Sequence, residues 1–161
     1  MDKVIKVGLG EVKTVVKPHI LATPSLGSCV AVILYDELMG IGSMAHIMLP
    51  DINLAKAKNN RTKFANTAVE VMLKEMIRLG ASKRRIKAKI VGGANMFPTV
   101  NLDNPMHIGL RNVAAVKNEL KRQKIRLVAE DTGGNYSRSV EFFVETSVVR
   151  IRNLFEGNQE I

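Results

Sequence analysis

The sequence predicts an α+β fold, a layered sandwich of mixed β-sheets flanked by helices, with one domain covering residues 1–161. Three observations support this. A chain of 161 residues that is 46% hydrophobic is long and apolar enough to bury one core. Short strand-like runs outnumber the helical runs and are interspersed with them along the chain. No repeat, low-complexity tract or Pro/Ser-rich linker divides the sequence. We expect only the last residues, about 157–161, to fray.

The first third of the chain predicts strands. An extended piece from Ile20 should break at Thr23-Pro24, because proline restricts the residue before it. The apolar run at 30–35 could form either a strand or the start of a helix. Its β-branched residues favour a strand, whereas a reactive cysteine just before it would favour a helix N-terminus. The strands expected over the whole chain are 4–7, 11–16, 20–22, 41–48, 86–91, 125–130, and a closing hairpin of 139–145 with 148–152.

Two helices are predicted, over 62–79 and about 108–124. In the first, apolar residues recur at helical spacing. Thr67 and Glu70 could form a capping box at its start, and Gly80 is well placed just past its end. The apolar positions of the first helix are Phe64, Ala65, Ala68, Val69, Met72, Met76 and Leu79.

The composition points to a cytoplasmic protein. One cysteine cannot form an internal disulfide, which suits a reducing compartment. The first ten residues lack the apolar core of a signal peptide, and no apolar run is long enough to span a bilayer. Three histidines and one cysteine, with no metal-ligand spacing, predict neither a metal site nor a cofactor.

The positive charge is concentrated in one segment. Residues 51–89 carry 11 of the 24 basic side chains but only 3 of the 15 acidic ones. Such a segment forms either a solvated face or a surface that attracts acidic partners. The low aromatic content, 4% with no Trp, argues against binding to single-stranded nucleic acid.

The candidate chemistry lies within 21–50. Cys29 follows the small residues Gly27 and Ser28, and His46 follows a second glycine-rich turn. A cysteine at a sharp turn and a histidine on the next apolar segment can form a thiolate–imidazole pair for acyl transfer. The N–H of Cys29 could hold the oxyanion that forms on attack. A buried inert cysteine and a core histidine are the alternative interpretation.

The third member of such a site stays open on the residues alone. Asp36 and Glu37 are close in sequence but belong to a turn. Thr23 lies on the other side of the cysteine turn, where its hydroxyl or carbonyl could accept the imidazole N–H.

Six segments in this order resemble the CheD family, the chemoreceptor glutamine deamidases of bacterial and archaeal chemotaxis. The resemblance covers roughly Val4 to Arg152. The segments are LGSCVAVILYD, GSMAHIMLPD, KFANTAVEVML, AKIVGGANMF, IGLRNVAAVK and AEDTGGNYSRSVEF.

This resemblance implies roles for individual residues. Cys29 matches the family's nucleophile, His46 its general acid/base, and Thr23 the threonine that orients the histidine. Gly27 and Ser28 would support the turn and the oxyanion.

The resemblance also implies an activity, partners and a fold. The enzyme would be a cysteine hydrolase that cleaves the amide C–N bond of selected glutamines and releases ammonia. Its partners would be the cytoplasmic helices of chemoreceptors (methyl-accepting chemotaxis proteins) and a CheC-type phosphatase, and the basic segment 51–89 would suit an acidic receptor. The fold would resemble that of deamidases of the cytotoxic-necrotising-factor type. One departure is visible, because Pro24 and Ser25 stand where we expect apolar or glycine residues.

Three other functions also fit parts of the sequence. A non-catalytic chemotaxis adaptor would bind receptors or a CheC-type phosphatase without chemistry. A thiol protease or methylester hydrolase would use the same residue pair. A nucleic-acid-binding domain would rest on the basic segment alone.

Overall fold

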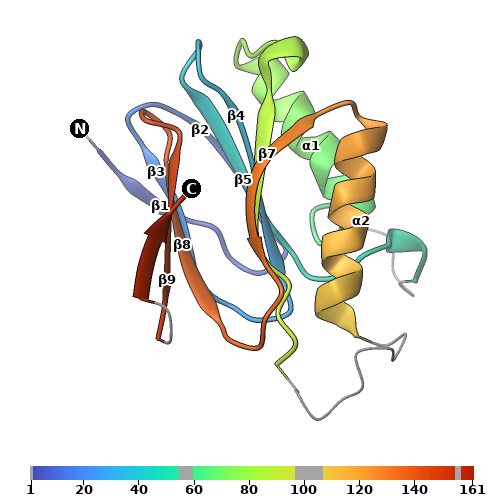
Figure 1. The fold of residues 1–161 in the computed structure, drawn as a ribbon. Coiled ribbons are helices and arrows are strands. Elements are labelled where there is room, and N and C mark those ends of the chain that lie inside the picture. The colour runs from blue at the N-terminus through green and yellow to red at the C-terminus, as the bar shows by residue number, and fades with distance from the viewer. Residues whose placement is uncertain (1, 55–59, 97–106, 155–156) are drawn as a thin grey trace.

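The chain folds into three layers, two β-sheets and a layer of two helices (Figure 1). The computed structural model describes residues 2–54, 60–96, 107–154 and 157–161. The predicted α+β layered sandwich is confirmed, with both described helices on one side of the central layer. The sequence also predicts irregular segments at 51–61 and 96–105, and their residues 55–59 and 97–105 lie outside the described part of the chain.

Within the described residues, each sheet has five strands. The outer sheet has the order β1-β3-β8-β9-β10, and the central sheet has the order β2-β5-β4-β6-β7. Both are mixed, because β1 pairs with β3 and β6 with β7 in parallel while the other pairs are antiparallel. The outer-sheet strands are β1 (Val4–Lys6), β3 (Ile20–Leu26), β8 (Arg138–Phe143), β9 (Val148–Asn153) and β10 (Gly157–Glu160). The central-sheet strands are β2 (Val12–Val16), β4 (Val30–Asp36), β5 (Ile41–Ile47), β6 (Lys87–Gly92) and β7 (Arg126–Thr132).

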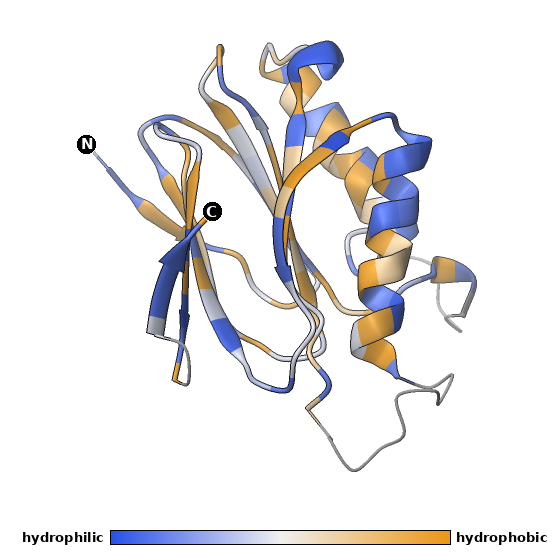
Figure 2. Cartoon of the chain, in the orientation of Figure 1, coloured by the Kyte–Doolittle hydropathy of each residue, from blue (hydrophilic) through white to orange (hydrophobic). Residues whose placement is uncertain are grey.

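The helical layer consists of α1 (Ala65–Arg78) and α2 (Ile108–Arg122). Two short 3₁₀ turns, η1 (Ile52–Leu54) and η2 (Lys83–Arg85), lie in the connections before α1 and after it. Figure 2 shows hydrophilic residues on the outward sides of the helices, as expected for helices that bury one apolar stripe. In the described part of the chain, no helix is long and apolar enough to cross a membrane.

The two interfaces between layers hold separate hydrophobic clusters. One packs the helices onto the central sheet, with Met72 and Val116 among its members. The other fills the space between the sheets, with Leu21, Met44 and Phe142 among its members. Strand β4 contributes alternate residues to both clusters, and all of its residues are buried. This burial on two faces explains the continuous apolar run and shows that the open segment at 30–35 is a strand, not a helix.

The predicted break at Thr23-Pro24 is wrong, because β3 continues to Leu26. The register between β3 and β8 shifts between Thr23 and Leu26, which marks a bulge. Ser25 takes a φ of 57°, in the left-handed region that glycine prefers. A bulge leaves residues outside the regular ladder, and proline is tolerated there because no ladder N–H is required.

The predicted fraying of residues 157–161 is also wrong. Gly157–Glu160 forms β10, which pairs antiparallel with β9. Ile161 continues the pairing, since its N–H donates to the carbonyl of Val149 and its carbonyl accepts from the same residue. The side chain of Lys89 reaches across from the central sheet and donates to the Ile161 carbonyl at 2.9 Å.

The ends of α1 correct one prediction and confirm another. The helix begins at Ala65 with Phe64 as N-cap, so Thr67 and Glu70 do not form the predicted capping box. The Thr67 hydroxyl donates to the carbonyl of Arg61 instead. At the other end Gly80 has a φ of 111° and donates to Ile77, as a residue just past the helix does in a Schellman motif.

A buried carboxylate, Asp36, ties together the end of the central sheet at which β4 ends. It accepts hydrogen bonds from the backbone of Met39 and Ser82 and from the guanidinium of Arg85. Burial alone raises the pKa of Asp36, but these donors outweigh burial and hold the pKa below its ordinary value.

Replacing Asp36 by asparagine is expected to lower the free energy of unfolding at pH 7 by about 2–4 kcal/mol, because charge-assisted bonds are lost in a buried site. The folded-state pKa lies below the unfolded value, so the wild-type advantage is complete above about pH 4 and fades as pH falls through the folded pKa. Urea unfolding of both proteins between acid and neutral pH measures this. The exposed neighbour Glu37, changed to glutamine, is the control. A difference between wild type and Asp36→Asn that does not change with pH would contradict the assignment.

Candidate active site

The central sheet brings Cys29 and His46 to the same face of neighbouring strands. Cys29 immediately precedes β4, and His46 lies in β5 directly opposite Ala31. Because side chains alternate along a strand, Cys29 and Ala31 share a face, and Cys29 packs against the cluster between the sheets. Cys29 and His46 are therefore diagonal cross-strand neighbours, a relation that corresponds to roughly 7–8 Å between backbones. Both side chains belong to the end of the sheet at which β4 begins.

The outer sheet supplies the third group. The Thr23 hydroxyl of β3 lies 2.9 Å from Nδ1 of His46, across the space between the sheets. Both residues are almost completely buried, with exposed fractions of 1% and 3%. When Nδ1–H donates to the threonine oxygen, the lone pair of the imidazole is on Nε2. Nε2 is buried and has no hydrogen-bond partner among the residues that the structure describes.

Asp36 and Glu37, the alternative third groups, lie at the opposite end of β4. The Asp36 carboxylate is bonded to Arg85 there. Of the three candidates, Thr23 is the one in contact with His46.

Both members of the Cys29–His46 pair are neutral at rest. Burial raises the pKa of the Cys29 thiol and lowers the pKa of the His46 imidazole. Cys29 directly precedes a strand and is not the first residue of a helix. A neutral imidazole can accept a proton near pH 7, so the site suits proton transfer during attack more than a thiolate formed in advance.

The segment after β6 donates hydrogen bonds to the backbone carbonyls of the turn that carries Cys29. The N–H of Ala94 donates to Gly27, and the N–H of Gly93 donates to Cys29. Among the described residues, none accepts a hydrogen bond from the N–H of Ser28 or of Cys29. These two N–H groups are therefore candidates to stabilise an oxyanion.

The backbone of the fold requires a glycine at position 92. Gly92 has a φ of 117°, and a Cβ placed there would lie 2.3 Å from the Cys29 carbonyl oxygen. The sequence indicates a flexible turn at this point, but only the fold shows that the turn presses against the backbone of Cys29.

The sequence analysis missed Asn112, a fully buried residue of α2. Its amide Nδ2 donates to the carbonyl of Ser28 at 3.0 Å and to that of Met48 at 3.1 Å. One side chain therefore joins the turn before β4 to the residue after β5. The sequence does contain a signal for Asn112: it is a polar residue on the apolar stripe of the helix, one turn before Val116.

A cysteine before a buried strand, beside a histidine held by a threonine, is the kind of arrangement that thiol-dependent hydrolases use. The chain matches the family model described as CheD chemotactic sensory transduction over residues 48–153. That match begins after His46, but similarity to whole proteins extends over the site.

The chain is 44% identical over 162 residues to the chemoreceptor glutamine deamidase CheD of Halalkalibacterium halodurans, covering 100% of both chains. It is 45% identical over 159 residues to the chemoreceptor glutamine deamidase CheD of Thermotoga maritima, covering 99% of this chain and 96% of the other. It is 43% identical over 153 residues to the probable chemoreceptor glutamine deamidase CheD of Thermococcus kodakarensis, covering 95% and 94%. The chain belongs to the CheD family.

Among solved structures, the Bacillus licheniformis hypothetical protein YfiH matches 81% of this chain and 59% of its own. The TM-score is 0.46 and the identity 18%, a likeness too low to bear on function.

Proposed function

We propose that this chain is a protein-glutamine deamidase that converts selected glutamine side chains of chemoreceptors to glutamate through a thioester on Cys29. The observation that carries the proposal is the buried contact between Thr23 and His46 beside Cys29, in a chain of the CheD family. The relatives' names supply the substrate class.

The first half of the reaction forms the thioester. Sγ of Cys29 attacks the side-chain amide carbon as its proton passes to Nε2 of His46. The carbonyl oxygen becomes an oxyanion, which the N–H groups of Ser28 and Cys29 can bind. As the C–N bond breaks, His46 returns the proton to the nitrogen and ammonia leaves.

The second half of the reaction hydrolyses the thioester. His46 takes a proton from water, and the oxygen adds to the thioester carbon. The C–S bond then breaks, His46 protonates the sulfur, and glutamate is released. The neutral resting state of both groups fits this cycle, because His46 begins each half as a base.

The partners and the compartment belong to the same proposal. Chemoreceptor cytoplasmic helices would be the substrate, a CheC-type phosphatase would bind the same protein, and both would meet it in the cytoplasm. The relatives' names support the chemoreceptor as a partner.

The experiment is product analysis. A purified chemoreceptor cytoplasmic fragment is incubated with the protein, and mass spectrometry locates each amide-to-acid conversion while ammonia is measured in parallel. Conversion at defined glutamines with equal ammonia release is the expected result. Peptide cleavage or hydrolysis of methyl esters alone would replace the proposed activity with another hydrolase. Binding without any product would indicate a non-catalytic adaptor.

Thr23 gives a sharp test of how His46 is oriented. Replacing Thr23 by valine keeps the shape but removes the oxygen near Nδ1, so kcat should fall about 10- to 100-fold with little change in KM. Thr23→Ser keeps the oxygen and should retain most activity. Steady-state deamidation of the receptor fragment measures both. Equal losses in the two variants would point to packing and not to the hydroxyl group.

A further inference from the structure

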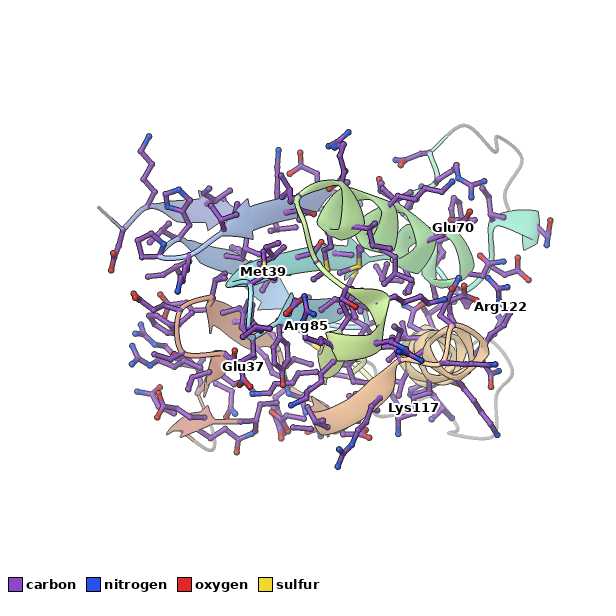
Figure 3. All side chains as sticks on the ribbon, turned by 90° about the horizontal axis from the view of Figure 1, so that it is seen from above. Glu37, Met39, Glu70, Arg85, Lys117 and Arg122 are labelled. Carbon is purple, nitrogen blue, oxygen red and sulfur yellow. The ribbon has the colours of Figure 1, made fainter. Side chains whose placement is uncertain are left out.

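The end of the central sheet at which β4 ends carries a hollow lined with basic side chains. The hollow has a volume of about 340 Å³, and among the described residues that line it Glu37 is the one acidic residue. Figure 3 views the molecule toward this end and labels Glu37, Met39 and Arg85 there. The basic lining residues come from η2, β6, β7 and the residues just after α2, and they are Arg84, Arg85, Lys87, Lys124 and Arg126.

Most of this positive charge is not neutralised within the chain. Arg85 pairs with the buried Asp36 at 3.0 Å. Within residues 2–54, 60–96, 107–154 and 157–161, no ion pair is formed by Arg84, Lys87, Lys124 or Arg126. Like charges gathered around a concavity repel one another and raise the local concentration of anions.

Exposed apolar side chains lie beside the basic hollow. Leu38, in the turn after β4, lines the hollow and is 73% exposed. The next residue, Met39, is 44% exposed, and its methyl group lies 3.5 Å from the place where a Cβ on Gly80 would stand. Leu79, at the end of α1, is 45% exposed. Exposed apolar side chains next to charged ones are typical of a protein-binding surface.

The hollow is also built on a rigid frame. The buried Asp36 carboxylate holds the turn at Met39, the backbone of Ser82 and the guanidinium of Arg85 in one network. A surface fixed in this way loses little entropy on binding.

We infer that this end of the molecule is a second docking surface, for an acidic polypeptide segment that places carboxylates in the basic hollow and an apolar side chain against Leu38 and Met39. The concave shape favours inserted side chains over a flat bilayer. Strand β4, which runs from the Cys29 end to this hollow, spans roughly 20 Å. A partner bound at the hollow therefore leaves the Cys29 end accessible. Three of the eleven basic side chains of segment 51–89, at Arg84, Arg85 and Lys87, therefore lie at the end opposite Cys29.

The test uses a fluorescein-labelled peptide of four Glu-Glu-Leu repeats, with a Ser-Ser-Leu peptide as the neutral probe. Fluorescence anisotropy measures binding to the full chain. Arg84→Glu combined with Lys124→Glu and Arg126→Glu should weaken binding of the acidic peptide at least about tenfold. The matched control changes the same number of charges elsewhere, with Lys6→Glu, Lys13→Glu and Lys63→Glu, and should bind within about threefold of wild type. Leu38→Ser should weaken binding by a smaller factor.

Several outcomes would overturn the inference. Equal weakening in the two charge variants would show attraction to net charge only. Equal binding of both peptides would remove the role of the carboxylates. The surface would be assigned to a membrane if the wild-type protein bound vesicles of phosphatidylcholine and phosphatidylglycerol but not the acidic peptide, and if the triple variant with Arg84→Glu lost the vesicle binding. Thermal unfolding checks each variant, and glutamine replacements at the same three positions serve where the glutamates prevent folding. None of these readouts requires deamidase activity.

Discussion

Deamidation is expected to fall at least about a thousandfold when Cys29 is replaced by serine. A serine hydroxyl is a far weaker nucleophile than a thiol, and burial lowers the pKa of His46, which makes the imidazole a weaker base toward the hydroxyl. The volume of the side chain hardly changes, so the loss should appear in kcat. Mass spectrometry of a receptor fragment after long incubation measures the residual rate.

The folded state of the Cys29→Ser protein provides the control. Cys29 makes no disulfide and is only partly buried, so the melting temperature should stay close to that of wild type. Fragment binding should also persist. A serine variant that retains a tenth or more of the wild-type activity would place the nucleophile elsewhere in the chain.

Replacing Gly92 by alanine should lower activity about a hundredfold and destabilise the protein by about 2–4 kcal/mol. The new methyl group would lie 2.3 Å from the carbonyl oxygen of Cys29, so the backbone on one side must move. Moving the turn that carries Cys29, the proposed nucleophile, by even about 1 Å would remove it from its attack geometry. Urea unfolding and the deamidation assay measure the two effects.

Gly133 offers a matched control for the backbone strain. It has a φ of 84°, also in the left-handed region, but a Cβ there would meet nothing within 4 Å. Gly133→Ala should therefore cost about 1 kcal/mol, the strain of the left-handed conformation alone. If the two alanine variants lose the same stability and activity, a clash with the Cys29 carbonyl is not the cause of the loss in Gly92→Ala.

The helices could be predicted because their signal is local. The apolar spacing in 62–79 reflects one helix lying on one sheet, and α1 follows it closely. Strand β10 could not be predicted in this way. Its residues, Gly157–Glu160, have no apolar alternation, and the backbone of β9 holds them in place. The course of β3 through Pro24 depends likewise on its pairing with β8.

The site shows the same division between local and long-range information. Cys29 and His46 stand out by residue type and by the glycine turns beside them. The residues alone left Thr23, Asp36 and Glu37 open, because the choice depends on which strand of the outer sheet faces β5. The resemblance to CheD singled out Thr23, and the structure brings its hydroxyl to His46. Asn112 acts through two backbone carbonyls, which no side-chain motif records.

Strand β4 is enclosed on both faces, so the backbone next to Cys29 is expected to move little. Amide hydrogens in such a strand exchange with solvent only when the whole molecule opens, while turns and outer strands fluctuate far more often. Cys29 is attached directly to the start of this strand. Local opening of the outer strands is therefore expected to displace the backbone at Cys29 less than the backbone of those strands.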